Sequence, residues 1–292
     1  MSQGFKAVIL SLLVGILNFV LKLGAYFITH SVAIYSDAME SIINIVSAGM
    51  AILGMKIALK PPDEEHPYGH TKVEYLFSIV EALFILGAGF SILWEAIRSL
   101  ILKHHLQHLY QGLGIVLLTL ILNSIVAAYL YYSGKKENSP ILLSHGSHIF
   151  ADVLTTGGVI VGVVLAKISK LEVIDSIIAI LVSVHILKMG ISIVKESGSS
   201  LLDKSLPQED IRKIRETLTN LLKNSCYQEI VYDITNFRTR KAGRRGFLEF
   251  DLVLPGHIPV ETACKICECM KSEIKRKFPQ LIVNIHIKAK KD

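Results

Sequence analysis

The chain has 292 residues, 51% of them hydrophobic, and carries a formal net charge of +6. Its mean hydropathy of +0.47 excludes an ordinary soluble protein, because the apolar runs reach the roughly 20 residues that a membrane-spanning helix needs. The positive charge does not indicate nucleic-acid binding, since the lysines cluster beside the apolar runs and no nucleic-acid motif accompanies them. An enzyme is not expected either, because the sequence has no nucleophile elbow, phosphate loop or metalloprotease helix.

The apolar runs stop about two thirds of the way along the chain. We therefore expect a six-helix transmembrane domain over residues 1–200 and a cytoplasmic domain over residues 201–292. An even number of spans places both termini on one side of the membrane. Lysines favour the linkers on that side, which predicts cytoplasmic termini. The expected spans are 7–29, 33–58, 73–99, 109–133, 141–167 and 172–197.

The second span contains acids where a membrane helix should have none. Glu40 and Asn44 are four residues apart, so their side chains lie on one helix face, and Asp37 lies near that face. An ionisable residue at the centre of a span costs roughly 2.5–3.5 kcal/mol on insertion scales, which makes it a candidate functional residue.

The fifth span repeats the pattern with His148 and Asp152, also four residues apart. If the two spans face each other, they offer carboxylates, an amide oxygen and an imidazole, a set that suits a tetrahedral divalent metal. The alternative is a set of hydrogen bonds between helices, which explains the amide and the imidazole better than the acids. The third and fourth spans look like plain packing or lipid-facing helices, with Asn123 as the main polar exception.

The last third of the chain alternates between helical and strand patterns. The predicted order is αββαβ, which indicates a small α+β domain of ferredoxin-like type with its helices on one sheet. The four cysteines all lie in this part and do not resemble a secreted disulfide framework. The expected elements are a helix at 208–222, strands at 230–240 and 247–254 around a turn at 243–246, a helix at 260–278 and a strand at 281–288.

Three fragments, in order along the chain, carry a resemblance to a known family. They are Ser31-Val32-Ala33-Ile34-Tyr35-Ser36-Asp37-Ala38, His66-Pro67-Tyr68-Gly69-His70-Thr71-Lys72-Val73-Glu74 and Leu202-Asp203. Together with the paired residues of the second and fifth spans, they resemble the cation diffusion facilitator family of divalent metal/proton antiporters over nearly the whole chain. The resemblance implies a homodimer in the cell (plasma or inner) membrane that exports a metal ion by alternating access. It implies that the protein has no cofactor. The expected partners are the metal ion, protons and the lipid bilayer.

By the same resemblance, Glu40, Asn44, His148 and Asp152 form the transport site. The family more often has His or Asp at the first position and Asp at the second. Asn44 can bind metal through its oxygen but cannot exchange a proton, and Asp37 could supplement the pair. His148 favours zinc or ferrous iron, whereas Glu40 and Asn44 favour a harder ion such as manganese. Zinc is the expected metal, with iron, manganese and cobalt as the alternatives. A metal sensor or scaffold with little transport activity is the second alternative.

The resemblance implies further metal positions outside the membrane. Asp63, His66 and His70 in the linker match a second zinc site of some relatives, against the alternative of a solvated polar turn. Lys72 and Asp203, the latter at the entry to the cytoplasmic domain, match a charge interlock that would hold two protomers together at the membrane surface. In the last domain, the residues that match metal ligands are Asp251, Cys264 and His286. The alternative for the cysteines is packing in the core.

Overall fold

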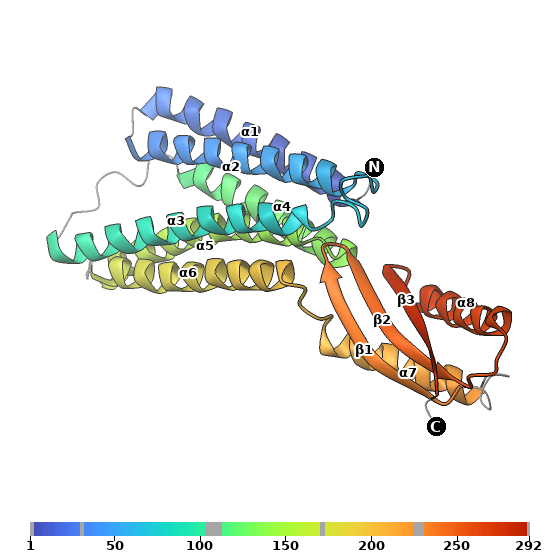
Figure 1. The fold of residues 1–292 in the computed structure, drawn as a ribbon. Helices are drawn as coiled ribbons and strands as arrows, with labels where there is room; N and C mark the ends of the chain where they lie inside the picture. Colours follow the sequence, from blue (N-terminus) through green and yellow to red (C-terminus); the bar gives the residue numbers. More distant parts are fainter. Residues whose placement is uncertain (1–2, 30–31, 103–112, 170–172, 225–230, 291–292) are drawn as a thin grey trace. The chain divides into compact units, whose positions relative to one another are not determined.

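The computed structural model describes residues 3–29, 32–102, 113–169, 173–224 and 231–290. The chain forms two compact units, Met1–Gly198 and Ser199–Asp292. The first unit is helical and the second combines helices with a sheet (Figure 1).

Six long helices make up the first unit. They are α1 (Gln3–Thr29), α2 (Val32–Ala58), α3 (Val73–Leu102), α4 (Leu113–Glu137), α5 (Pro140–Ser169) and α6 (Val173–Leu201). Five of them, all except α5, contain described stretches long and apolar enough to cross a membrane. α5 is itself 30 residues long, but the side chains of 162–169 lie outside the described residues. The predicted spans agree with these helices to within a few residues, and the predicted membrane-helical fold class is confirmed.

α5 is the central helix of this unit, because α4 and α3 both pack on it, while α1 lies beside α2 and α4 (Figure 1). Its start follows from Pro140, whose fixed φ suits the first turn of a helix. One apolar cluster joins α1, α2, α4 and α5 through residues such as Met55, Leu130 and Leu142, all fully buried. α2 approaches α3 and α5 closely at Gly54, where a β-carbon would lie 2.4 Å from Ile141.

The second unit is a three-stranded sheet with two helices. Its elements are α7 (Gln208–Asn224), β1 (Asp233–Ala242), β2 (Arg245–Leu254), α8 (Val260–Lys277) and β3 (Leu281–Ala289). The sheet order is β1-β2-β3, with β1 antiparallel and β3 parallel to β2. The predicted order αββαβ is therefore confirmed. The hairpin is tighter than predicted, because Ala242 pairs with Arg245 and Gly243 turns the chain with φ 59°.

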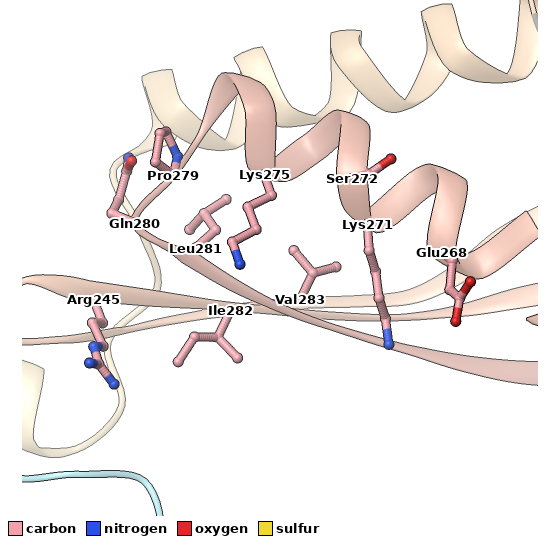
Figure 2. Close-up of a pocket in the computed structure, with 10 residues that line it drawn as sticks. All are labelled: Arg245, Glu268, Lys271, Ser272, Lys275, Pro279, Gln280, Leu281, Ile282 and Val283. Carbon is pink, nitrogen blue, oxygen red and sulfur yellow. The ribbon is translucent and has the colours of Figure 1, made fainter. Parts of the chain in front are cut away.

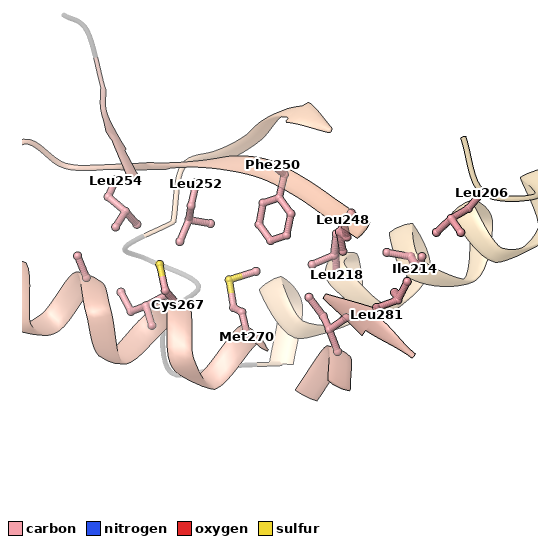
Figure 3. Packing of buried hydrophobic residues seen from close by; sticks show 13 residues of the cluster. Leu206, Ile214, Leu218, Leu248, Phe250, Leu252, Leu254, Cys267, Met270 and Leu281 are labelled. Carbon is pink, nitrogen blue, oxygen red and sulfur yellow. The ribbon is translucent and has the colours of Figure 1, made fainter. Parts of the chain in front are cut away.

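Both helices cover the same face of this sheet. Phe250 and Leu252 on β2 point toward Met270 and Cys267 on α8, and Leu218 of α7 completes the core (Figure 3). Since successive residues of a strand point to opposite faces, odd-numbered residues of β2 such as Asp251 lie on the face away from the helices.

Candidate metal sites

Three of the four predicted transport-site residues meet between α2 and α5. The Asn44 side chain donates a hydrogen bond from Nδ2 to Oδ2 of Asp152 at 2.7 Å. Its Oδ1 accepts a hydrogen bond from Nε2 of His148 at 3.0 Å. His148 and Asp152 are buried, and the buried Nδ1 of His148 has no hydrogen-bond partner among the described residues. The three side chains therefore present an amide oxygen, an imidazole nitrogen and a carboxylate in one small volume.

Besides Asn44, α2 carries two acids. Asp37 and Glu40 lie on α2 one to two turns before Asn44, and their side chains are outside the described residues. Their helical spacing is compatible with a ligand on the same face as Asn44.

A small cavity of about 10 Å³, lined in part by polar side chains, adjoins Asn44 on the side of α1 and α4. Asn18 donates a hydrogen bond to Asn123 at 2.8 Å across it, which explains the polar residue expected in the fourth span. Ser11 also lines this cavity. The space beside the three residues is thus hydrophilic, although it lies among apolar helices.

The prediction of a mostly plain packing or lipid-facing third span does not account for Glu81. This carboxylate is 1% exposed and contacts Ser47 of α2 and His145 of α5. Sequence reasoning missed the pair, although two signals were available: an acid inside an apolar span, and a histidine three residues before His148.

In the linker between α2 and α3, Asp63, His66 and His70 converge, with one candidate ligand atom from each lying within 4.8 Å of the others. Asp63 contacts Nδ1 of His66 at 3.2 Å and Nε2 of His70 at 3.3 Å. The backbone N–H of His66, which donates to Asp63, is the main cause that lowers the pKa of this carboxyl group. Among the described residues this is the one group of three such ligands, and its chemistry suits zinc.

The three tail positions do not converge within one chain. Asp251 and His286 are register partners on β2 and β3 and share the open face of the sheet. Cys264 is exposed on α8, which packs on the opposite face. Asp251 is already engaged, because Lys288 and Asn236 both contact its Oδ2. The Lys288 hydrogen bond is the first cause that lowers the pKa of this carboxyl group.

The two residues of the predicted interlock belong to different units. Lys72 precedes α3 in the helical unit, whereas Asp203 belongs to the C-terminal unit and pairs with Arg240 at 3.3 Å. Their mutual contact stays a prediction.

A groove of about 600 Å³ also opens beside α8 and β3 (Figure 2). Lys271 and Lys275 extend into it from α8, Arg245 lies at its other side, and Glu268 is its one acid. This lining lacks a set of metal ligands.

Comparison with known proteins places these sites in context. Residues 8–202 match the family model of the cation efflux transmembrane domain, and residues 206–290 match that of the cation efflux protein cytoplasmic domain. The transporter sll1263 of Synechocystis sp. is 34% identical over 275 residues, covering 93% of this chain and 86% of the relative. The cation-efflux pump FieF of Citrobacter koseri is 26% identical, covering 96% and 91%. The solved zinc form of CzrB is 33% identical over 30% of this chain and 93% of its own, with a TM-score of 0.27.

Proposed function

The chain belongs to the cation diffusion facilitator family of multi-pass membrane transporters, and we propose that it exports zinc in exchange for protons. The observation that supports this proposal most directly is the contact of Asn44 with both His148 and Asp152. Polar groups buried between membrane helices are expensive to hold there, so a cluster with ligand chemistry favours an ion site over a packing role. Glu40, one turn before Asn44, would supply the fourth ligand.

Zinc fits the mixed donor set. It accepts imidazole nitrogen and carboxylate oxygen in a tetrahedral arrangement, and two carboxylates would balance its charge in a medium of low dielectric. Within the described part of the chain, Nδ1 of His148 has no hydrogen-bond partner that a cation would have to displace. Ferrous iron, manganese and cobalt accept the same donor types and are the alternative cargoes.

Proton exchange follows from the protonation of the ligands. Metal binds the deprotonated carboxylate and the neutral imidazole, so loading releases protons and unloading takes them up. Glu40, His148 and Asp152 are the candidate carriers in the site, whereas the Asn44 amide cannot take part. Reorientation of the loaded helices between the two sides of the membrane then gives antiport.

The proposed arrangement is a homodimer with both termini in the cytoplasm. The match of residues 206–290 to the cytoplasmic domain of cation efflux proteins supports the orientation. The position of Lys136 supports it too. This lysine, in the last turn of α4, donates a hydrogen bond to Gln3 at the start of α1, so it lies at the same end of the helical unit as the N-terminus. Lysines are enriched on the cytoplasmic side of membrane proteins.

Reconstitution into liposomes with an imposed pH gradient tests the proposal. Uptake of zinc, iron, manganese and cobalt would be followed for the wild type, for Asp152→Asn and for Glu95→Gln, which alters an exposed acid of α3. We expect gradient-dependent zinc transport that Asp152→Asn abolishes and Glu95→Gln preserves.

Two other outcomes have distinct meanings. Transport of another of these metals without zinc would retain the mechanism and change the cargo. Absence of transport for all four metals, with zinc still bound by the linker residues Asp63, His66 and His70, would indicate a sensor or scaffold instead.

A further inference from the structure

A second buried polar cluster lies one helical turn from the proposed metal site. It consists of Ser11 on α1, Ser47 on α2, Glu81 on α3 and His145 on α5, all at most 5% exposed. Ser47 follows Asn44 by three residues on α2, and His145 precedes His148 by three residues on α5. Both clusters therefore join the same two helices at successive turns.

In this cluster, the hydrogen bonds hold one proton on Nδ1 of His145, whereas a second proton can bind to Nε2 and dissociate from it. The Ser47 hydroxyl donates its single hydrogen to Oε2 of Glu81 at 2.5 Å. Nδ1 of His145 then faces two acceptors, Oγ of Ser47 at 3.3 Å and Oε1 of Glu81 at 3.2 Å. Because neither of these oxygens has a hydrogen to offer, Nδ1 must carry one itself when Glu81 is ionised.

The other ring nitrogen is not constrained in this way. Nε2 of His145 lies 2.8 Å from the hydroxyl of Ser11, which can either donate or accept a hydrogen bond. The neutral ring would accept from Ser11 and the protonated ring would donate to it, with the heavy atoms in the same positions. The cluster can thus bind and release a proton at Nε2 without rearrangement.

A route leads from this nitrogen toward the metal site. Ser11 lines the same polar cavity as Asn44, so the hydroxyl that faces Nε2 also borders the space beside the proposed transport residues. His145 and His148 are one turn apart on α5, so a charge at one of them acts on the other.

The surrounding helices carry other titratable groups. On α3, Glu74 lies two turns before Glu81, and on α6, which packs on α3 through Ile186, His185 and Lys188 are exposed. The side chains of Asp37 and Glu40 are outside the described residues. The other described titratable groups of these helices are Lys6 and Lys22 on α1, Lys56 on α2, Tyr75, Glu95 and Arg98 on α3, His148 and Asp152 on α5, Lys195 and Glu196 on α6, and Tyr129, Tyr131, Tyr132, Lys135, Lys136 and Glu137 on α4.

From this geometry we infer that Glu81 and His145 form a proton-binding site that works with the metal site, a role that rests on the proposed antiport. A dication arriving at Asn44, His148 and Asp152 repels the imidazolium of His145. Nε2 then gives its proton through Ser11 to the cavity, which leaves a neutral imidazole beside an ionised Glu81. When the metal leaves, the proton returns by the same path. The pair supplies a proton that Asn44 cannot.

Proton release on zinc binding tests this assignment without requiring transport. The purified full-length protein in weakly buffered detergent solution would be titrated with zinc while a pH dye records released protons. We expect Glu81→Gln and His145→Gln to keep zinc binding but to release about one proton fewer per zinc than the wild type. In liposomes, the same variants should move fewer protons per zinc.

Glu74→Gln is the matched control, because Glu74 is also a buried carboxylate of α3 that accepts a hydrogen bond from a serine, Ser139, at 2.6 Å. Its proton release should equal that of the wild type. A role of Glu81 in packing alone would lower stability or transport rate but leave the proton count unchanged, and that result would overturn the proposal.

Loss of one bound zinc per chain in Glu81→Gln would also overturn it, because the pair would then be a metal site. Ser11→Ala provides a milder test if the other variants do not fold. It removes the partner of Nε2 and should shift the pH dependence of proton release while leaving zinc stoichiometry intact. Absence of zinc transport by the wild type would count against the proposed antiport. The detergent measurement does not depend on transport, so it tests the proton-binding pair separately.

Discussion

Lys288 on β3 places its Nζ 2.5 Å from Oδ2 of Asp251 on β2, so the sheet supplies this buried carboxylate with a cation of its own. Asn236, whose φ of 49° follows from an irregularity in the pairing of β1 with β2, donates to the same oxygen. A metal ion bound through Oδ2 would have to displace the ammonium group. The tail metal site that the sequence suggests therefore competes with an internal ion pair.

Acidification should loosen this part of the sheet. Because Lys288 lowers the pKa of Asp251 from its ordinary value of 3.8, the ion pair stabilises the fold above that value. The stabilisation is lost as the pH falls through the lowered pKa. Hydrogen-exchange protection factors for β2 and β3 amides should decrease over this range.

Replacement of Lys288 by Met should remove this pH dependence of amide protection, because the Asp251 carboxylate then loses the cation that it pairs with. We expect lower protection of β2 at neutral pH and a pKa of Asp251 closer to 3.8. Lys275→Met, which changes an exposed lysine of α8, is the control. Equal protection in both variants would show that the ion pair contributes nothing measurable.

The linker cluster should bind zinc independently of transport. Asp63→Asn removes one of three converging ligands and should abolish zinc binding at the linker, measured by calorimetry, while the transmembrane site still binds. Glu64→Gln, next in the chain, should leave binding unchanged.

The core of the C-terminal unit depends on Phe250, which is fully buried between β2 and the helices. Phe250→Ala should lower the free energy of unfolding of this unit by about 3–5 kcal/mol. Limited proteolysis of the full-length protein should then cut after residue 199 sooner, while the helical unit stays protected. Leu202→Ala, at an 85% exposed position, should behave like the wild type.

Periodicity was sufficient to predict the elements. Apolar runs of helical length gave six helices, and alternation along 247–254 gave β2 with its even-numbered residues in the core. The i, i+4 spacing also predicted that His148 and Asp152 would share a face of α5, and both contact Asn44. These features depend on local geometry, which the sequence encodes directly.

Contacts between distant helices were beyond this reasoning. Glu81 meets His145 because α3 packs on α5, a pairing that no local pattern along the chain reveals. Alternation placed Asp251 on the open face of the sheet but gave no sign that Lys288 would pair with it. Core packing was the alternative for the cysteines, and the helical period turns Cys267 into the core but Cys264 to the surface.

The proton count of the transport site can be raised by a single substitution. Asn44→Asp would put a carboxylate oxygen about where Nδ2 now lies, 2.7 Å from Oδ2 of Asp152. Two carboxylates at such a distance cannot both ionise without a cation between them, so the metal-free variant should hold an additional proton. Zinc binding would expel it, and dye titration should record about one more proton per zinc than in the wild type. Asn44→Ser adds no titratable group and should not change the count. If Asn44→Asp released the same number of protons as the wild type, Asn44 would have to lie outside the metal site.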